Sequence, residues 1–219
     1  MSRKRVACLI SGRGSNMAAL IEAAKAPDCP AEIVLVVSNV AGAGGLATAS
    51  AAGIATATVD HKSFGKDRAA FERVLQDTLA QHRIDLVCLA GFMRLLTPWF
   101  VGQWPNLMLN IHPALLPSFK GLDTHARALE AGVKVHGATV HFVVPEMDSG
   151  PVIAQGAVPV KDDDTETSLA ARVLAVEHRI YPLALRLVAA GRVTVAGNRC
   201  RIDGGIVPEM ELLVPSEGT

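Results

Sequence analysis

The segment that most constrains this chain is a strand-like run that ends in two polar residues and a proline. Residues 107–109 are apolar, Asn110 and His112 stand two positions apart, and Pro113 follows directly. Residues i and i+2 of a strand point to the same face, so Asn110 and His112 are expected side by side. Proline cannot donate to a central strand ladder, so Pro113 predicts the end of the strand. The segment therefore predicts a polar pair at the carboxyl end of a buried strand, where open α/β sheets bind ligands.

The two polar side chains suit a particular kind of chemistry. An amide donor beside an imidazole fits a reaction in which negative charge develops on a carbonyl oxygen. The alternative is a structural role, in which Asn110 ends the strand and the ring of His112 is satisfied by hydrogen bonds within the protein.

Strand-like apolar runs alternate with helical patterns through the first half of the chain. Strands are predicted at residues 6–10, 33–37, 54–59, 85–90 and 107–111. Helices are predicted between them, at residues 15–25, 45–52 and 67–81. This alternation predicts an α/β fold with a doubly wound, mostly parallel sheet and a Rossmann-like N-terminal half.

The pattern changes after His112. Residues 137–144 and 152–160 are extended runs separated by a turn-rich link, which predicts a mixed-sheet extension. Residues 165–190 read as a long helix bent near Pro182, and residues 193–202 as a small terminal hairpin. Because no linker or repeat interrupts the chain, we expect a single domain over residues 1–219. Its halves are residues 1–110, which bind the nucleotide phosphate, and residues 111–219.

A glycine-rich turn at residues 11–16 follows the first predicted strand and opens the first helix. Backbone N–H groups at the start of a helix bind anions such as phosphate. The dinucleotide fingerprint GxGxxG is not met, because Met17 stands where the third glycine is needed. The turn therefore predicts a site for a single phosphate of a small substrate. The alternative is a tight turn in which Ser15 or Asn16 caps the helix.

Charge and composition argue against several partners. Lys+Arg and Asp+Glu both number 21, which leaves no net charge, and aromatic residues make up only 4% of the chain. Nucleic acid and acidic membrane surfaces are therefore not expected as partners. Cys8 and Cys88 lie in apolar runs and are expected to be reduced core residues. The apolar run behind the basic N-terminus is too short for a signal peptide or a membrane span, so a cytoplasmic protein is expected.

The seven histidines show no spacing typical of a metal site. His136 and His141 are five residues apart, so on one strand they would face opposite ways. A Ser-His-Asp hydrolase is disfavoured as well, because the chain has no GxSxG turn.

Further segments make the chain resemble the folate-dependent phosphoribosylglycinamide (glycinamide ribonucleotide) formyltransferases of purine biosynthesis. The matching segments, in order, are residues 11–16, 90–96, 110–117, 121–125, 136–142 and 148–153, followed by Glu177-His178 and Tyr181-Pro182. The resemblance runs nearly end to end. It implies the formyltransferase fold and 10-formyltetrahydrofolate as co-substrate. It further implies small-molecule substrates, no metal, and a monomer or homodimer.

The resemblance also implies a division of roles. Asn110, His112 and Asp148 correspond to the catalytic trio. The ribonucleotide substrate would be held through its phosphate by Gly14, Ser15 and Asn16, and at its glycinamide end by Glu177. The folate would contact, in chain order, Arg68, Met93, Arg94, Leu95, Leu96, Asn110, Val144, Pro145, Glu146, Met147 and Asp148.

The implied reaction is direct formyl transfer to the amine of N1-(5-phosphoribosyl)glycinamide. Asn110 and a protonated His112 would stabilise the charge on the tetrahedral intermediate, and Asp148 would keep the imidazole cationic and help relay the amine proton. Residues 111–219 would then form the folate-binding and catalytic half.

Other families share the segment at residues 110–117. Methionyl-tRNA formyltransferases carry a further basic RNA-binding domain, for which 219 residues without net charge leave no room. Formyltetrahydrofolate hydrolases usually add an N-terminal regulatory domain, whereas here the first strand is expected to start at Val6. A noncatalytic nucleotide-binding module would explain the glycine-rich turn but not Asn110, His112 and Asp148.

Overall fold

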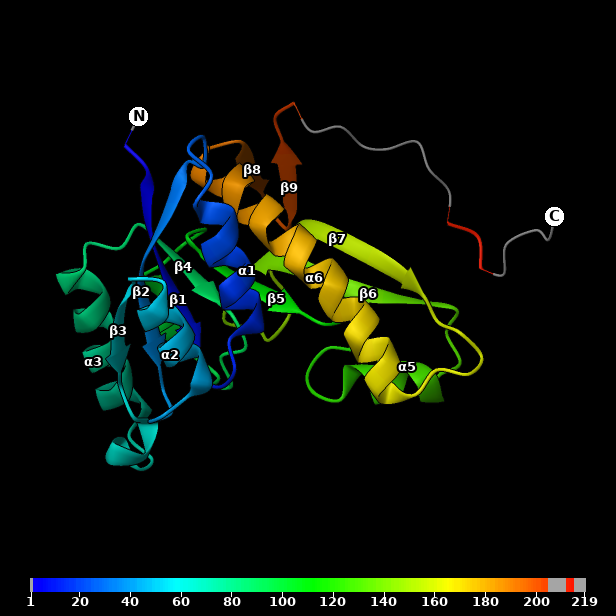
Figure 1. Ribbon diagram of the computed structural model, residues 1–219, viewed down its shortest axis with the longest axis horizontal. Coiled ribbons are helices and arrows are strands. Elements are labelled where there is room, and N and C mark those ends of the chain that lie inside the picture. Colours follow the sequence, from blue (N-terminus) through cyan, green and yellow to red (C-terminus); the bar gives the residue numbers. More distant parts are fainter. Residues whose placement is uncertain (1, 205–211, 215–219) are drawn as a thin grey trace.

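The computed structural model describes residues 2–204 and 212–214, and within them nine strands form one mixed sheet (Figure 1). Five neighbouring strands run parallel, in the spatial order β3 (Ala55–Thr58), β2 (Ala31–Ser38), β1 (Lys4–Ile10), β4 (Leu86–Leu89) and β5 (Met108–His112). These are the five strands predicted for the first half. The doubly wound, mostly parallel sheet is therefore confirmed.

The sheet continues beyond β5 with strands of mixed direction. The antiparallel strands β6 (Val135–Phe142) and β7 (Val152–Pro159) follow β5. A terminal hairpin of β8 (Val193–Ala196) and β9 (Arg199–Ile202) extends the edge, with β9 parallel to β7. The predicted mixed-sheet extension and hairpin are both confirmed.

Helices cover the two faces of the sheet unequally. One face carries α1 (Ser15–Ala24), α2 (Gly44–Ala51), α5 (Thr124–Glu130) and α6 (Glu166–Ala189). The other carries α3 (Arg68–Gln81) and α4 (Pro98–Gly102), with a short 3-10 turn, η1 (His61–Phe64), before α3. The four helices predicted from periodicity are present, and α6 runs without a break through Pro182. The short elements α4, α5 and η1 were not predicted.

The layer of α3 and α4 does not extend over the end of β5, and this uncovered region holds Asn110 and His112. Leu109 and Ile111 of β5 belong to the core under α1 and α6, so Asn110 and His112 point to the opposite face. The buried cluster on that face joins α3 and α4 to β1, β2 and β4, and it reaches β5 only at Met108. Beyond that point, in the described part of the chain, connecting segments cover the face. Asn110 and His112 therefore face loops rather than a helix.

Candidate active site

Three side chains predicted to act together meet on this face of β5. Asn110 and His112 lie two residues apart, and the Asp148 Oδ2 atom lies 3.5 Å from the His112 Nδ1 atom. Strand β6 leaves the sheet beside the start of β5, since the Val143 N–H donates to the Met108 carbonyl at 2.9 Å. The connection between β6 and β7 must therefore fold back along the face to bring Asp148 beside the end of β5.

The imidazole of His112 makes a hydrogen bond with one ring nitrogen and faces a carboxylate with the other. Its side chain is almost buried, and the Nε2 atom lies 2.9 Å from the carbonyl oxygen of Phe119. A carbonyl can only accept, so Nε2 carries a hydrogen. Nδ1 faces the Asp148 carboxylate at the longer distance of 3.5 Å. Nδ1 is therefore the ring atom that makes no hydrogen bond within the described residues.

Asp148 is held by a segment distant in sequence. The Gly121 N–H donates to its Oδ2 atom at 2.9 Å, and the residue itself has a left-handed φ of +50°. This hydrogen bond joins residues 27 positions apart in the sequence and connects the loop before α5 to the β6–β7 connection. Asp148 is therefore held in place by a connection that is distant in sequence.

The structure adds His141 of β6, which sequence reasoning did not place in the site. Its Nδ1 atom donates to the Phe142 carbonyl at 2.9 Å, and its Nε2 atom lies 3.2 Å from the Asn110 amide nitrogen. Burial lowers the pKa of His141 most strongly, and the nearby His112 and Lys120 lower it further. The Phe142 carbonyl and the Asp148 carboxylate act in the opposite direction.

A neutral His141 ring has one donor and one acceptor, and its donor is used by Phe142. The His141 Nε2 atom then accepts one hydrogen of the Asn110 NH2 group. This fixes the orientation of the amide and leaves the second hydrogen of the NH2 group for a ligand. The only signal for this role is the cross-strand pairing of Asn110 with His141, which requires the register of β5 and β6.

The glycine-rich turn forms an open helix N-terminus. Gly14 occupies the N-cap position of α1 with φ +71°, and no side chain caps the helix. The alternative in which Ser15 or Asn16 caps the helix is therefore wrong. A Cβ atom on Gly14 would lie 3.3 Å from the Cα atom of Gly45, so the turn packs closely against the start of α2. The first N–H groups of α1 are left for an anion.

Two residues assigned to the ribonucleotide meet behind this turn. Asn16 is buried, and its Nδ2 atom donates to the Glu177 Oε2 atom of α6 at 2.7 Å. Burial raises the pKa of Glu177, and the hydrogen bond from Asn16 partly offsets this. The Oδ1 atom of Asn16 is buried and has no hydrogen-bond partner among the described residues. A buried polar atom without a hydrogen-bond partner is typical of a site that a ligand completes.

Ser11 links the glycine-rich turn to the segment after β4. Its hydroxyl accepts from the Met93 N–H at 2.7 Å and donates to the Asn39 side chain at 2.6 Å, and its own N–H donates to the Gly91 carbonyl at 3.1 Å. The turn assigned to the phosphate and the segment assigned to the folate are therefore joined directly. Ser11 was not predicted as a site residue.

The segment after β4 and the β6–β7 connection expose apolar side chains. Met93 is 69% exposed and Met147 is 51% exposed, whereas Leu96 packs against the core. Large apolar side chains this open to solvent are typical of a surface that a flat apolar ligand covers. Leu95 is likewise mostly exposed. Arg94 and Val144 are partly buried, and Pro145 and Glu146 lie on the surface.

Arg68 is exposed at the first position of α3, where no described side chain pairs with it. One turn further, the buried carboxylate of Glu72 accepts from the N–H of Thr97 at 2.7 Å and from the Thr97 hydroxyl. Residues i and i+4 share a helix face. Arg68 therefore lies on the face of α3 that holds the end of segment 93–96.

The remaining histidines form no metal site within residues 2–204 and 212–214, where no cluster of three His, Cys, Asp or Glu side chains has the arrangement to hold an ion. His136 lies on the opposite face from His141, as predicted, with its ring centroid 5.4 Å from that of His125. Burial lowers the pKa of His136 to about 4. Cys8 and Cys88 are fully buried thiols, as predicted.

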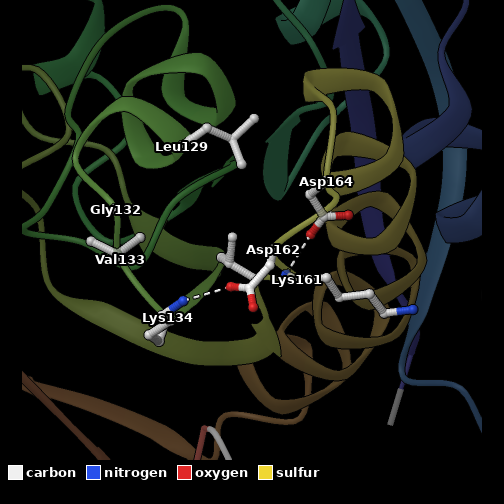
Figure 2. A pocket seen from close by; sticks show the side chains of 8 residues that line it. Leu129, Gly132, Val133, Lys134, Lys161, Asp162 and Asp164 are labelled. Atoms are coloured by element: carbon white, nitrogen blue, oxygen red, sulfur yellow. Dashed lines mark hydrogen bonds and ion pairs between the residues drawn. The ribbon is translucent and has the colours of Figure 1, made fainter.

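A hollow of about 260 Å3 lies away from the trio, near the ends of α5, β6 and β7 (Figure 2). The Lys134 ammonium donates to the exposed Asp162 carboxylate at 2.7 Å across it, and the Lys161 N–H donates to Asp164. Lys134 pairs with Asp162, and the carboxylate of Asp164 pairs with Arg172, so the hollow adds nothing to the site. Within the described residues, no helix has the length and apolar character needed to cross a bilayer.

Comparison with known proteins gives a consistent result. Residues 4–185 match the formyl transferase family. The chain is 45% identical over 203 residues to the phosphoribosylglycinamide formyltransferase of Escherichia coli (strain K12), which covers 93% of this chain and 95% of that protein. It is also similar to the crystal structure of glycinamide ribonucleotide transformylase 1 from Symbiobacterium toebii. The TM-score is 0.89 at 45% identity, over 92% of this chain and 94% of that one.

Longer relatives are similar as well. The chain is 52% identical over 201 residues to the trifunctional purine biosynthetic protein adenosine-3 of Gallus gallus, a match that covers 91% of this chain. This chain spans only 20% of the length of that protein.

Proposed function

The chain belongs to the formyl transferase family, and we propose that it transfers a formyl group from 10-formyltetrahydrofolate to the amine of N1-(5-phosphoribosyl)glycinamide. The products are the formylglycinamide ribonucleotide and tetrahydrofolate, and the enzyme is a cytoplasmic one of purine biosynthesis. The observation that carries the proposal is the convergence of Asn110, His112 and Asp148 at the end of β5, beyond the part of this sheet face that α3 and α4 cover in the described residues.

The geometry supports stabilisation of an oxyanion as the central contribution of the protein. When the amine adds to the formyl carbon, negative charge develops on the formyl oxygen. The Asn110 amide and the Nδ1 side of the His112 ring lie on the same face of β5, and in the proposed mechanism both would donate to this oxygen, His112 in its protonated form. Donors held in place before the reaction stabilise such charge without reorganising.

Asp148 has two roles in this proposal. Its carboxylate faces Nδ1 of His112, so its negative charge would stabilise positive charge on the ring during the reaction. It also accepts the proton that the amine releases on attack, directly or through a water, and that proton is passed to N10 of the folate as the carbon–nitrogen bond breaks. The Gly121 N–H holds the carboxylate in place for both steps.

The substrates are proposed to reach this centre from two sides. The open N-terminus of α1 at Gly14, Ser15 and Asn16 would hold the phosphate, and Glu177 would hold the glycinamide end. The pterin would cover the exposed apolar side chains of segments 93–96 and 144–148, with Arg68 at its rim. Both halves of the chain therefore contribute to folate binding, because segment 93–96 precedes residue 110.

A formylation assay tests the proposal. The purified chain is mixed with 10-formyltetrahydrofolate, with and without the ribonucleotide, and both the formylated ribonucleotide and tetrahydrofolate are measured by mass spectrometry. We expect equal amounts of the two products, formed only when the ribonucleotide is present. Release of formate without the ribonucleotide would instead identify a formyltetrahydrofolate hydrolase.

The phosphate site yields a first prediction. Ser15 is exposed at the first position of α1, where Ser15→Asp places a carboxylate against the substrate phosphate. We expect the KM for the ribonucleotide to rise about tenfold or more, which corresponds to about 1.4 kcal/mol. We do not expect the higher KM to come from unfolding of the variant, because an acidic residue in the first turn stabilises a helix. The neutral variant Ser15→Asn is the control, and equal KM values for all three proteins would remove the turn from the site.

The folate surface yields a second prediction. Met93 is 69% exposed, so Met93→Asp leaves the core intact and places a charge where the pterin would lie. We expect binding of a folate analogue, measured by calorimetry, to weaken about tenfold or more, with the ribonucleotide KM within about twofold of the original. Leu183→Asp, at a half-exposed leucine of α6, is the matched control. If the Met93 variant keeps normal affinity for the analogue, the pterin lies elsewhere.

A further inference from the structure

The loop at residues 117–123, between β5 and α5, holds two members of the trio through its backbone. Its Phe119 carbonyl accepts from Nε2 of His112 at 2.9 Å, and its Gly121 N–H donates to Asp148 at 2.9 Å. Backbone groups hold a side chain in place only as well as their own segment is held. The conformation of this loop therefore governs the geometry of the catalytic pair.

The loop adopts a backbone conformation that needs outside support. Phe119 has φ +52° and Asp123 has φ +54°, both in the left-handed region that residues with a Cβ atom rarely adopt. Gly121, at φ +83°, is suited to this region. A segment with two such residues persists only where its surroundings over-determine it.

Arg127 of α5 supplies that support. Its Nη1 atom donates to the carbonyl of Lys120 at 2.7 Å and to the carbonyl of Leu122 at 3.3 Å, on the two sides of Gly121. Its guanidinium carbon lies 5.7 Å from the centre of the Phe119 ring, within range of a cation–π contact. One side chain thus contacts three of the loop residues around the two backbone groups that hold His112 and Asp148.

The helix that carries Arg127 is itself anchored. Ala128 of α5 is fully buried in the core under α6, and Thr124 is buried at the start of the helix. Arg127 therefore contacts the loop from a helix that is packed against the core. A second tie runs from the exposed Lys120 Nζ to the Ser149 hydroxyl at 2.6 Å, and it is weaker support because holding a long lysine side chain in one rotamer costs conformational entropy.

We propose that Arg127 is a positioning residue for formyl transfer. The proposal rests on the proposed function, because it assumes that His112 and Asp148 are the catalytic pair. The polar contacts of Arg127 go to the loop and not to Asn110, His112 or Asp148. It acts by keeping the loop in the one conformation that presents the Phe119 carbonyl to His112 and the Gly121 N–H to Asp148.

The test compares Arg127→Ala with Arg127→Lys. Arg127→Ala is expected to lower kcat about tenfold or more, the equivalent of one charge-assisted hydrogen bond, with the ribonucleotide KM within about twofold. Lysine keeps the cation and can donate to the same carbonyls but loses the planar group that stacks on Phe119, so Arg127→Lys is expected to recover only part of the lost kcat. The matched control is Arg192→Ala, because Arg192 donates twice to the Asp203 carbonyl in the terminal hairpin, at 2.8 and 2.6 Å. The control is expected to leave kcat unchanged.

Two measurements without substrate separate this proposal from the proposed function. In Arg127→Ala, amide hydrogens of residues 117–123 and the Nε2 hydrogen of His112 are expected to exchange about tenfold faster, while those of β5 do not. If the original chain fails to formylate the ribonucleotide but these exchange rates rise, the proposed function fails and the loop role of Arg127 stands. Unchanged exchange in the loop, or unchanged kcat in an active enzyme, overturns the role of Arg127.

Discussion

Replacing Asp148 by asparagine is expected to lower turnover by about two or more orders of magnitude, the typical loss when a positioned acid–base group is removed. Asparagine keeps the size of the side chain and an oxygen that can accept from the Gly121 N–H. It also tolerates the left-handed φ of +50° at this position. The change therefore removes the negative charge facing His112 and leaves the turn in place.

The loss is expected in kcat, with the KM values for both substrates within about threefold of the original, because the substitution acts on the intermediate and on proton transfer. Asp162→Asn is the matched control, since that carboxylate is exposed and pairs only with Lys134 among the described residues. It is expected to keep normal turnover. Turnover close to that of the original enzyme in Asp148→Asn would leave Asp148 as a turn residue and refute the proposed mechanism.

Replacing Gly150 by alanine is expected to lower the free energy of unfolding by about 2 kcal/mol or more. A Cβ atom there would lie 1.8 Å from the Phe142 carbonyl oxygen and 2.9 Å from its carbonyl carbon. Because these are backbone atoms, no side-chain rotation relieves the overlap, and the β6–β7 connection must move away from β6. Asp148 lies two residues earlier in that connection, so kcat is expected to fall together with stability.

Gly102→Ala provides the comparison, because a Cβ atom at Gly102 would meet no atom within 4 Å and the residue lies in α4. Alanine is favoured over glycine in a helix, so this variant is expected to unfold at the same denaturant concentration as the original or a higher one. Equal unfolding midpoints for Gly150→Ala and the original protein would show that the connection adapts without strain.

Local patterns predicted the regular elements well, because they report on properties of one segment at a time. The expected strand at residues 107–111 is β5 at Met108–His112, and Pro113 ends it. The helices missed by periodicity, α4 and α5, have five and seven residues. Elements this short contain two turns at most and carry no detectable hydrophobic period.

Contacts between distant segments escaped the sequence for a different reason. His141 faces Asn110 because β6 pairs with β5 in one particular register, and a shift of one residue would turn His141 to the other face. The partner of His112 Nε2 is a backbone carbonyl, at Phe119, and every residue has such a group. Neither the register of two strands nor the path of a loop can be read from residue types.

The sequence by itself determined that Asn110 and His112 share a face at the end of a buried strand, and that a glycine-rich helix start follows the first strand. Both follow from the two-residue period of strands and from the backbone requirements of glycine and proline. The tertiary structure alone decided how Asp148 is held beside His112, that His141 orients Asn110 and that Arg127 supports the loop between them. These contacts join β5, β6 and α5 to the loop at residues 117–123 and to the β6–β7 connection. They form only when the strands have paired in this register and when α3 and α4 leave the end of β5 uncovered.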